Sequence, residues 1–224
     1  FNNEASLKKY LDRINIHPNN MEKDENLEIL IAGCGTGQHV IEEALKFRKS
    51  NLVAIDLSFK SLSFAIRKTN EIGINNIEYF QGDILDLGKL DKKFDLIESS
   101  GVLHHMEQPF EGWKTLSESL NVNGIMLIGL YSDIARRDIK KAREIIKEKG
   151  LKENACDIKK FRKYITSNKV HKEIVNIPRS TDFFSLSACR DLLFHSQEHR
   201  YTIPRIKKEI EKLNLKFLGF QHPN

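Results

Sequence analysis

The sequence lacks several features that define whole classes of protein. No apolar run approaches the ~20 residues that a membrane-spanning helix needs, and no signal peptide is visible. Cysteine is scarce, and Cys34, Cys156 and Cys189 are widely spaced and odd in number. This argues against a disulfide framework and indicates reduced thiols in a cytoplasmic protein. No Cys/His spacing resembles a zinc site, so we expect no metal.

The composition is that of a globular protein with an uneven charge. Its 224 residues are 40% hydrophobic and 30% charged, enough for one large domain with a subdomain. The net charge is +5, but residues 132–180 alone hold 15 Lys and Arg against 7 Asp and Glu, a net charge of +8. The rest of the chain therefore carries −3. The basic excess belongs to one segment, which bears on the choice of substrate.

A glycine-rich stretch is the most informative feature that is present. The apolar run Ile29–Ala32 is followed by Gly33-Cys34-Gly35-Thr36-Gly37, and a helical pattern begins at Gln38. Such glycines let a ligand approach the backbone, and the helix start offers unpaired N–H groups. The stretch is not a P-loop, and Gln38 stands where a dinucleotide fingerprint needs glycine. It predicts a nucleotide-bearing ligand; the alternative is a tight turn without one.

Apolar runs alternate with helical patterns from Leu27 to Tyr131. We expect strands over Leu27–Ala32, Asn51–Ile55, Ile77–Gln81, Phe94–Glu98 and Ile125–Tyr131, with a sixth at Leu215–Gln221. Helices are expected between them, including Gln38 to about Arg48 and Phe110–Leu120. Strands separated by helices predict an α/β, Rossmann-like, doubly wound and mostly parallel sheet with helices on both faces.

The chain is expected to divide into four parts. Residues 1–26 are an N-terminal extension, 27–131 a cofactor-binding core, 132–205 a helical insertion between strands five and six, and 206–224 the last helix and strand. The insertion is much longer than a usual connection and is predicted to cover the substrate.

The residues at the carboxyl ends of the expected strands should meet at one edge of the sheet, where ligands of such folds bind. Asp56 lies about twenty residues beyond the first glycines, where a carboxylate can hold both ribose hydroxyls; its alternative is an exposed acid or a helix cap. Leu57 beside it can pack on a purine or belong to the core. Asp83 can accept from an adenine amino group, or simply form a turn with Gly82.

Four motifs in order resemble the class I S-adenosylmethionine-dependent methyltransferases. They are Ile31-Ala32-Gly33-Cys34-Gly35-Thr36-Gly37, Ala54-Ile55-Asp56, Gly82-Asp83-Ile84, and Phe94-Asp95-Leu96-Ile97-Glu98 with Val102-Leu103-His104-His105. The resemblance covers about Leu27–Tyr131. The turn Asn123-Gly124 is similar to the family's Leu-x-Pro-Gly-Gly turn, although the proline is absent.

The resemblance implies a role for each motif toward S-adenosyl-L-methionine. The loop through Gln38 lies along the methionine part, Asp56 holds the ribose, and Asp83 with Ile84 frames the adenine. The backbone around Glu98, Ser99 and Ser100 faces the methionine amino group. The family often has an acid where this chain has Ala32, so that contact is lost or made elsewhere.

The tail from about Ser180 resembles a bacterial subgroup of these enzymes, some of which are joined to tetratricopeptide repeats. The family's sheet ends in a seventh, antiparallel strand, for which the sequence after Leu215–Gln221 has no room. We therefore expect a truncated fragment, or a sheet completed in another way.

The expected chemistry is methyl transfer, in which the protein chiefly positions the acceptor. His104 and His105 follow strand four and are candidate general bases; capping or internal hydrogen bonding is the alternative. Tyr131 is a candidate substrate wall or a core residue. Candidate anchors for an acidic substrate are Arg136, Arg137, Arg190, His195, His199 and Arg200, each of which is alternatively a surface residue.

The acceptor remains open. A small molecule or peptide is favoured over RNA, because the lysines of the basic segment are interleaved with acids and no series of exposed aromatics accompanies them. RNA held through its phosphates is the alternative. Outside this class, the sequence leaves a nicotinamide-dependent oxidoreductase and a non-catalytic cofactor-binding protein.

Overall fold

A computed structural model of the chain describes residues 6–13, 25–167, 174, 176–194 and 197–221. The chain forms two compact units: residues 1–130 with 204–224, and residues 131–203. None of the described helices is both long and apolar enough to cross a membrane.

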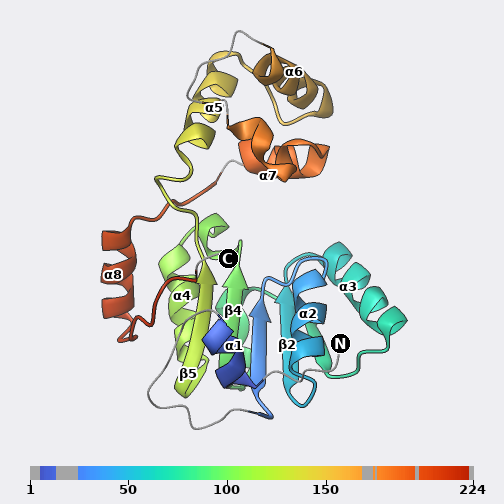
Figure 1. Cartoon of the computed structure of the whole chain (residues 1–224), viewed down its shortest axis with the longest axis vertical. Helices are drawn as coiled ribbons and strands as arrows, with labels where there is room; N and C mark the ends of the chain where they lie inside the picture. The colour runs from blue at the N-terminus through green and yellow to red at the C-terminus, as the bar shows by residue number, and fades with distance from the viewer. Residues whose placement is uncertain (1–5, 14–24, 168–173, 175, 195–196, 222–224) are drawn as a thin grey trace. The chain divides into compact units, whose positions relative to one another are not determined.

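Unit 1 is built on a parallel sheet (Figure 1). Its five described strands are β1 (Glu28–Ala32), β2 (Asn51–Asp56), β3 (Ile77–Gln81), β4 (Phe94–Ser100) and β5 (Leu120–Gly129). They are ordered β3-β2-β1-β4-β5, and every neighbouring pair is parallel. The direction of winding reverses between β1 and β4, which is where such sheets bind their ligands. The predicted Rossmann-like fold is confirmed.

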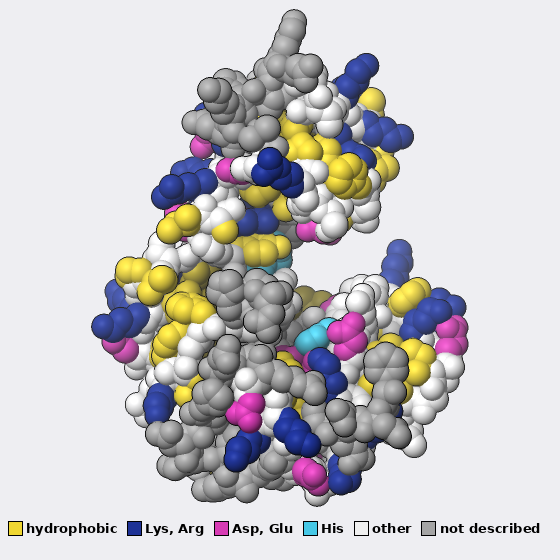
Figure 2. Space-filling view, in the orientation of Figure 1, with side chains coloured by type: hydrophobic (Ala, Val, Ile, Leu, Met, Phe, Trp, Pro, Cys, Tyr) yellow, Lys and Arg dark blue, Asp and Glu magenta, His cyan; other side chains and the backbone are white. Residues whose placement is uncertain are grey.

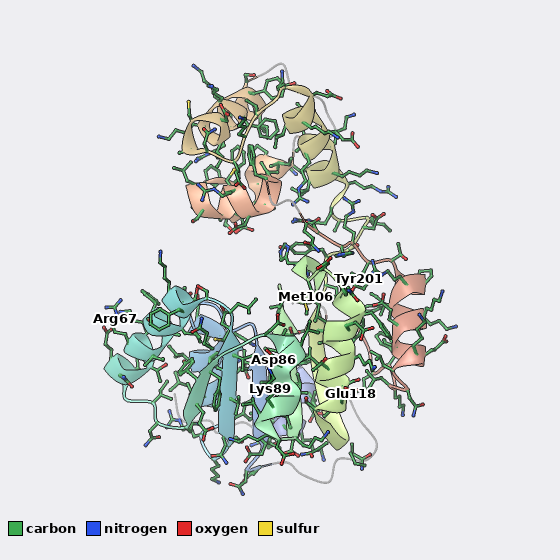
Figure 3. The ribbon with its side chains drawn as sticks, turned by 180° about the vertical axis from the view of Figure 1, so that it is seen from behind. Arg67, Asp86, Lys89, Met106, Glu118 and Tyr201 are labelled. Carbon is green, nitrogen blue, oxygen red and sulfur yellow. The ribbon has the colours of Figure 1, made fainter. Side chains whose placement is uncertain are left out.

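Helices cover both faces of the sheet, as parallel strands require. One face carries α1 (Leu7–Arg13), α2 (Gln38–Lys46) and α3 (Phe59–Ile72), whose apolar side chains share a core with β1 and β2. The other face, seen from behind in Figure 3, carries α4 (Pro109–Glu118) and the 3₁₀ helix η1 (Ile84–Leu90), with Glu118 on the former and Asp86 and Lys89 on the latter. Helix α8 (Ile203–Lys212) adjoins α4, because Lys212 Nζ lies 5.2 Å from the centre of the Phe110 ring.

The fifth strand begins earlier than predicted. It starts at Leu120, and the predicted turn at Asn123-Gly124 lies within it. Asn123 has a φ of 62°, a conformation that asparagine tolerates. The pairing with β4 shifts there: Phe94 opposes Leu120, but Leu96 opposes Ile125. The turn residues therefore form an irregularity within the strand and do not precede it, and α4 ends at Glu118 accordingly.

The predicted sixth strand is wrong. Residues 215–221 form no strand, and Phe217, Leu218 and Phe220 are all exposed. An alternation of apolar side chains indicates a strand only where another strand pairs with its backbone, and none does so among the described residues. The sheet of the described chain therefore ends at β5.

Unit 2 is a small helical body with its own core. It contains the helices α5 (Arg137–Glu148), α6 (Ala155–Thr166) and α7 (Leu186–Phe194). Two short 3₁₀ turns, at Ile177–Arg179 and at Thr181–Phe183, precede α7. Phe161, Phe183 and Cys189 are almost completely buried among the aliphatic side chains of these helices. The buried face of α5 is formed by Ile139, Ala142, Ile145 and Ile146.

A buried carboxylate fixes the chain that leaves this body. The side chain of Glu198 is 1% exposed and accepts hydrogen bonds from Arg136 Nε at 3.2 Å and Nη2 at 2.5 Å, and from Arg143 Nη2 at 2.9 Å. Burial acts to raise the pKa of Glu198, but the two guanidinium groups outweigh it and hold the pKa below its ordinary value of 4.5. The stabilisation is therefore present above pH 4.5 and is lost as the pH falls through the lowered pKa.

We predict that Glu198→Gln lowers the stability of unit 2 by about 3 kcal/mol at pH 7, because it leaves two partly buried guanidinium groups without their counter-charge. Thermal unfolding should show the loss at pH 7 and a smaller difference from the wild type near pH 3. Glu144→Gln is the matched control, because Glu144 is half-exposed on the same unit and, among the described residues, pairs with Lys141 alone, at 3.3 Å. An equal effect of both substitutions would contradict the assignment.

Candidate cofactor site

The conformation of the glycine loop is fixed by positive φ angles and by backbone hydrogen bonds. Gly33, Gly35 and Gly37 have φ values of 83°, 53° and 86°, which other residues rarely adopt. The amides of Gly33 and Cys34 both donate to the carbonyl of Ile55 at 2.9 Å. A side chain on Gly37 would lie 2.6 Å from Ala65 Cβ, whereas one on Gly35 would meet no protein atom within 4 Å. The loop is thus packed on α3 at one glycine and open at another.

Asp56 ties this loop to the end of β2. Its Oδ2 accepts the amide of Gly35 at 2.7 Å, and its Oδ1 accepts the amide of Ser58 at 2.8 Å. Ser58 is the N-cap of α3. The carboxylate therefore fixes the relative positions of the loop and of α3. Leu57, beside it, is 68% exposed and belongs to no core.

The next motif also ends a strand. Gly82 donates to the carbonyl of Asp56 at 3.1 Å, and Asp83 Oδ1 accepts the amide of Leu85 at 3.0 Å to start η1. Asp83 thus follows directly on a residue that is hydrogen-bonded to Asp56. Its carboxylate also caps η1, which is a local structural role of the kind considered as the alternative to adenine binding. Ile84 is 5% exposed and packs in the core, whereas Leu85 beside it is half-exposed.

The side chain of Glu98 lies at the point where the winding reverses. Glu98 on β4 opposes Ile31 on β1, so it places a buried carboxylate beside the strand that ends at Ala32 without an acid. Its Oε1 accepts the hydroxyl of Tyr10 at 3.0 Å, and its Oε2 contacts His39 Nε2. The neighbouring Ser99 is buried and Ser100 is exposed.

Sequence reasoning missed three residues around Glu98. Tyr10 comes from α1, and His39 and Glu43 lie one helical turn apart on α2. The hydrogen bond that His39 donates to the Glu98 carboxylate raises the pKa of His39. Burial, with Glu98 beside it, raises the pKa of both Tyr10 and Glu43. The only signal in the sequence was the i, i+4 spacing of His39 and Glu43, which does not reveal the third partner.

The two candidate bases differ in exposure. Both belong to the 3₁₀ turn η2 (Leu103–His105), with ring centres 4.4 Å apart in an edge-to-face contact. His104 is 1% exposed, whereas His105 is partly exposed. Among the two, His105 is thus the one whose ring reaches the surface.

Several of the candidate anchors in unit 2 have partners within the protein. The Arg136 guanidinium lies 3.9 Å from the centre of the Tyr131 ring and binds Glu198. Arg190 Nε donates to the carbonyl of Glu153 at 3.1 Å, and Arg200 pairs with Asp133 at 3.2 Å. The remaining candidates are Arg137, which is exposed, His199, which is partly exposed, and His195, which lies outside the described residues.

A parallel sheet with a glycine loop at its point of reversal and acids at the ends of β2 and β3 defines a protein that binds a nucleoside-bearing cofactor. Comparison with known proteins narrows this broad class to one kind of enzyme. Residues 23–132 match the family model described as "Methyltransferase domain". These residues form a methyltransferase domain, and the match agrees with the predicted resemblance to the class I S-adenosylmethionine-dependent enzymes and with S-adenosyl-L-methionine as the cofactor.

Curated relatives share different portions of the chain. An uncharacterized protein of Synechococcus sp. is 30% identical over 205 residues, which are 86% of this chain and 48% of that protein. A malonyl-[acyl-carrier protein] O-methyltransferase of Halalkalibacterium halodurans is 31% identical over 112 residues, 49% of this chain and 41% of its own. A tRNA U34 carboxymethyltransferase of Campylobacter jejuni is 32% identical over 97 residues, 43% and 32% respectively. The chain thus spans half or less of these relatives.

Solved structures agree on the fold. PKMT2 from Rickettsia typhi superimposes with a TM-score of 0.73 at 22% identity, over 94% of this chain and 43% of that protein. The same protein in complex with AdoHcy gives a TM-score of 0.72. The likeness extends through nearly the whole chain, both units included.

We predict that Gly35→Ala weakens S-adenosylhomocysteine binding by more than tenfold, because the added Cβ points into space that a ligand, and no protein atom, would fill. Gly73→Ala is the matched control: Gly73 also has a positive φ, of 80°, and also has no neighbour within 4 Å of an added Cβ. Each substitution should cost about 1 kcal/mol of stability through backbone strain. Calorimetry showing equal cofactor affinity for the two variants would contradict the placement of the cofactor.

Proposed function

We propose that this chain transfers the methyl group of S-adenosylmethionine to a small-molecule or peptide acceptor. The observation that carries the methyltransferase part is the glycine loop, held by Asp56 and open at Gly35, within the matched domain. The nicotinamide-dependent alternative is not retained, since the family assignment identifies a different cofactor.

The residues present fit this cofactor. The open face of the loop from Gly33 to Gln38 would hold the methionine part, and Asp56 would hold the ribose. Asp83 would accept a hydrogen bond from the adenine amino group. The exposed side chain of Leu57 and the backbone at Ile84 would flank the adenine ring. The backbone of Glu98, Ser99 and Ser100 would face the amino-acid end. The cofactor supplies a methyl group that is already activated as a sulfonium.

The protein's part in the reaction is then to orient the acceptor and to remove a proton where the acceptor carries one. We assign the general-base role to His105, because its ring is partly exposed. His104 is buried against it, so it would position the His105 ring and not touch the acceptor.

For this assignment, His105→Ala should lower kcat by about 10²–10⁴-fold, the usual contribution of a general base, with little change in cofactor affinity. Steady-state kinetics and calorimetry on the same preparation would separate the two effects. Equal losses of cofactor affinity and kcat would indicate a structural role for His105.

The pairing of the basic side chains supports the small-molecule or peptide acceptor. Many cations of unit 2 bind acids of the same unit, as in Arg136 and Arg143 with Glu198, Lys141 with Glu144, and Lys160 with Asp157. On the face seen in Figure 2, the Lys and Arg side chains of this part are interspersed with acidic and apolar ones. A surface that tracks RNA phosphates would present its cations unpaired and in a row. We therefore interpret unit 2 as the part that recognises the acceptor, with Tyr131, Arg190 and His199 as candidates for contacting it. Arg136, the other residue expected there, would instead hold the Tyr131 ring in place, because its guanidinium is paired with buried Glu198.

RNA remains the second candidate, because the segment is nevertheless basic and one relative acts on tRNA U34 by its name. The two candidates are separated by incubating the purified chain with methyl-labelled S-adenosylmethionine and a fractionated cell extract. Label should appear in the small-molecule or protein fraction and resist ribonuclease. Label confined to the RNA fraction, and lost on ribonuclease treatment, would contradict the proposed acceptor. A Gly35→Ala chain serves as the negative control.

A further inference from the structure

Three metal-ligating side chains converge beside the glycine loop. His39 and Glu43 are separated by one turn of α2, and Glu98 projects from β4 toward them. One ligand atom from each lies within 4.8 Å of the other two. Residues four apart on a helix present their side chains on the same face, and two ligands with this spacing plus a third from elsewhere are a common metal-binding arrangement.

A second observation indicates that the negative charge of the cluster is only partly balanced. Glu43 is 1% exposed, and its Oε2 has no hydrogen-bond partner among the residues that the structure describes. An unpaired buried carboxylate oxygen is costly, and buried carboxylates are ordinarily paired or bound to metals. Glu98, also buried, brings a second carboxylate to the same place. Two carboxylates this close repel each other unless a cation lies between them.

The cations now present satisfy the cluster only in part. Lys46 Nζ lies 2.5 Å from Glu43 Oε1, and the other ring nitrogen of His39 is 3.9 Å from the same oxygen. The side chains of Lys46 and His39 are 38% and 46% exposed, so both have room to change rotamer. His39 also gives the cluster an opening to solvent, through which an ion can enter.

We propose that His39, Glu43 and Glu98 form a binding site for a divalent cation of the zinc type. Imidazole nitrogen with carboxylate oxygen suits Zn²⁺, whereas Mg²⁺ and Ca²⁺ prefer oxygen ligands alone. Three protein ligands leave a further position for water. Tyr10, which donates to Glu98, would orient that carboxylate from outside the metal's own ligands.

The site would join the first turn of α2 to β4. Because α2 begins at Gln38, directly after Gly37, the ion would fasten the helix start to which the cofactor loop leads. The sequence predicted no metal, because no Cys/His spacing in it resembles a zinc site. Glu98 lies 59 residues from His39, and only the folded sheet brings the two side chains together. The proposal does not depend on methyl transfer, so either can fail without the other.

The test is calorimetric titration of the full chain, freed of metal with a chelator, using Zn²⁺ and Mg²⁺ separately. We expect one equivalent of Zn²⁺ to bind and Mg²⁺ to bind at least tenfold more weakly. His39→Gln and Glu43→Gln should each weaken Zn²⁺ binding more than tenfold. Glu42→Gln is the matched control, because Glu42 is adjacent on the same helix, accepts a hydrogen bond from Gln38 at 3.1 Å, and lies outside the cluster.

Folding is checked in parallel. Thermal unfolding should show that Zn²⁺ raises the Tm of the wild type and of Glu42→Gln but not of the two ligand variants. If Glu43→Gln fails to fold, the half-exposed His39→Gln carries the test alone. Absence of Zn²⁺ binding, or binding of equal strength in the ligand variants and the control, would overturn the proposal.

Discussion

The carboxylate of Asp56 is the constraint on which the cofactor site depends. It accepts the amide of Gly35 with one oxygen and that of Ser58 with the other. A loop of three glycines has many conformations in the unfolded chain, and its ordering costs conformational entropy. Hydrogen bonds donated by the loop amides to the charged Asp56 carboxylate and to the carbonyl of Ile55 select one of these conformations. The site is therefore formed largely within the protein itself, with the open side of Gly35 left for a ligand.

Each unit also buries a glutamate side chain, and the two differ in how well they are paired. Glu198 in unit 2 is satisfied by two guanidinium groups, so its cost of burial is offset and the chain leaving α7 is fixed. Within the described part of the chain, Glu43 in unit 1 has a hydrogen-bond partner on only one of its two oxygens. This contrast is informative, since a half-satisfied buried carboxylate reduces stability unless something else binds there. Glu198 thus has a structural role, whereas Glu43 is the carboxylate for which we propose a bound cation.

Sequence patterns predicted the sheet and its loop because both are local. A buried strand, a glycine turn and an amphipathic helix each leave a periodic signal within a few residues, and β1 to β4 lie where that signal placed them. The failures have long-range causes. The Asn123-Gly124 pair was interpreted as a turn, but strand pairing continues across it with a shift in register. The apolar residues after Leu215 have strand-like spacing but no partner strand.

The same distinction applies to the site. Asp56 and Asp83 follow their strands directly and could be selected from the sequence. Tyr10 and His39 could not, because their role depends on Glu98, which is 88 and 59 residues away respectively. The guanidinium of Arg136 looked available in the sequence, and only the fold shows that Glu198 and the Tyr131 ring bind it.

Hydrogen–deuterium exchange with and without S-adenosylhomocysteine tests the central claim most directly. The placement of the cofactor predicts added protection at residues 33–38, 56–58 and 83–85, at the carboxyl ends of β1, β2 and β3, with little change at the opposite ends of these strands. Protection confined to unit 2, or to the opposite edge of the sheet, would contradict it.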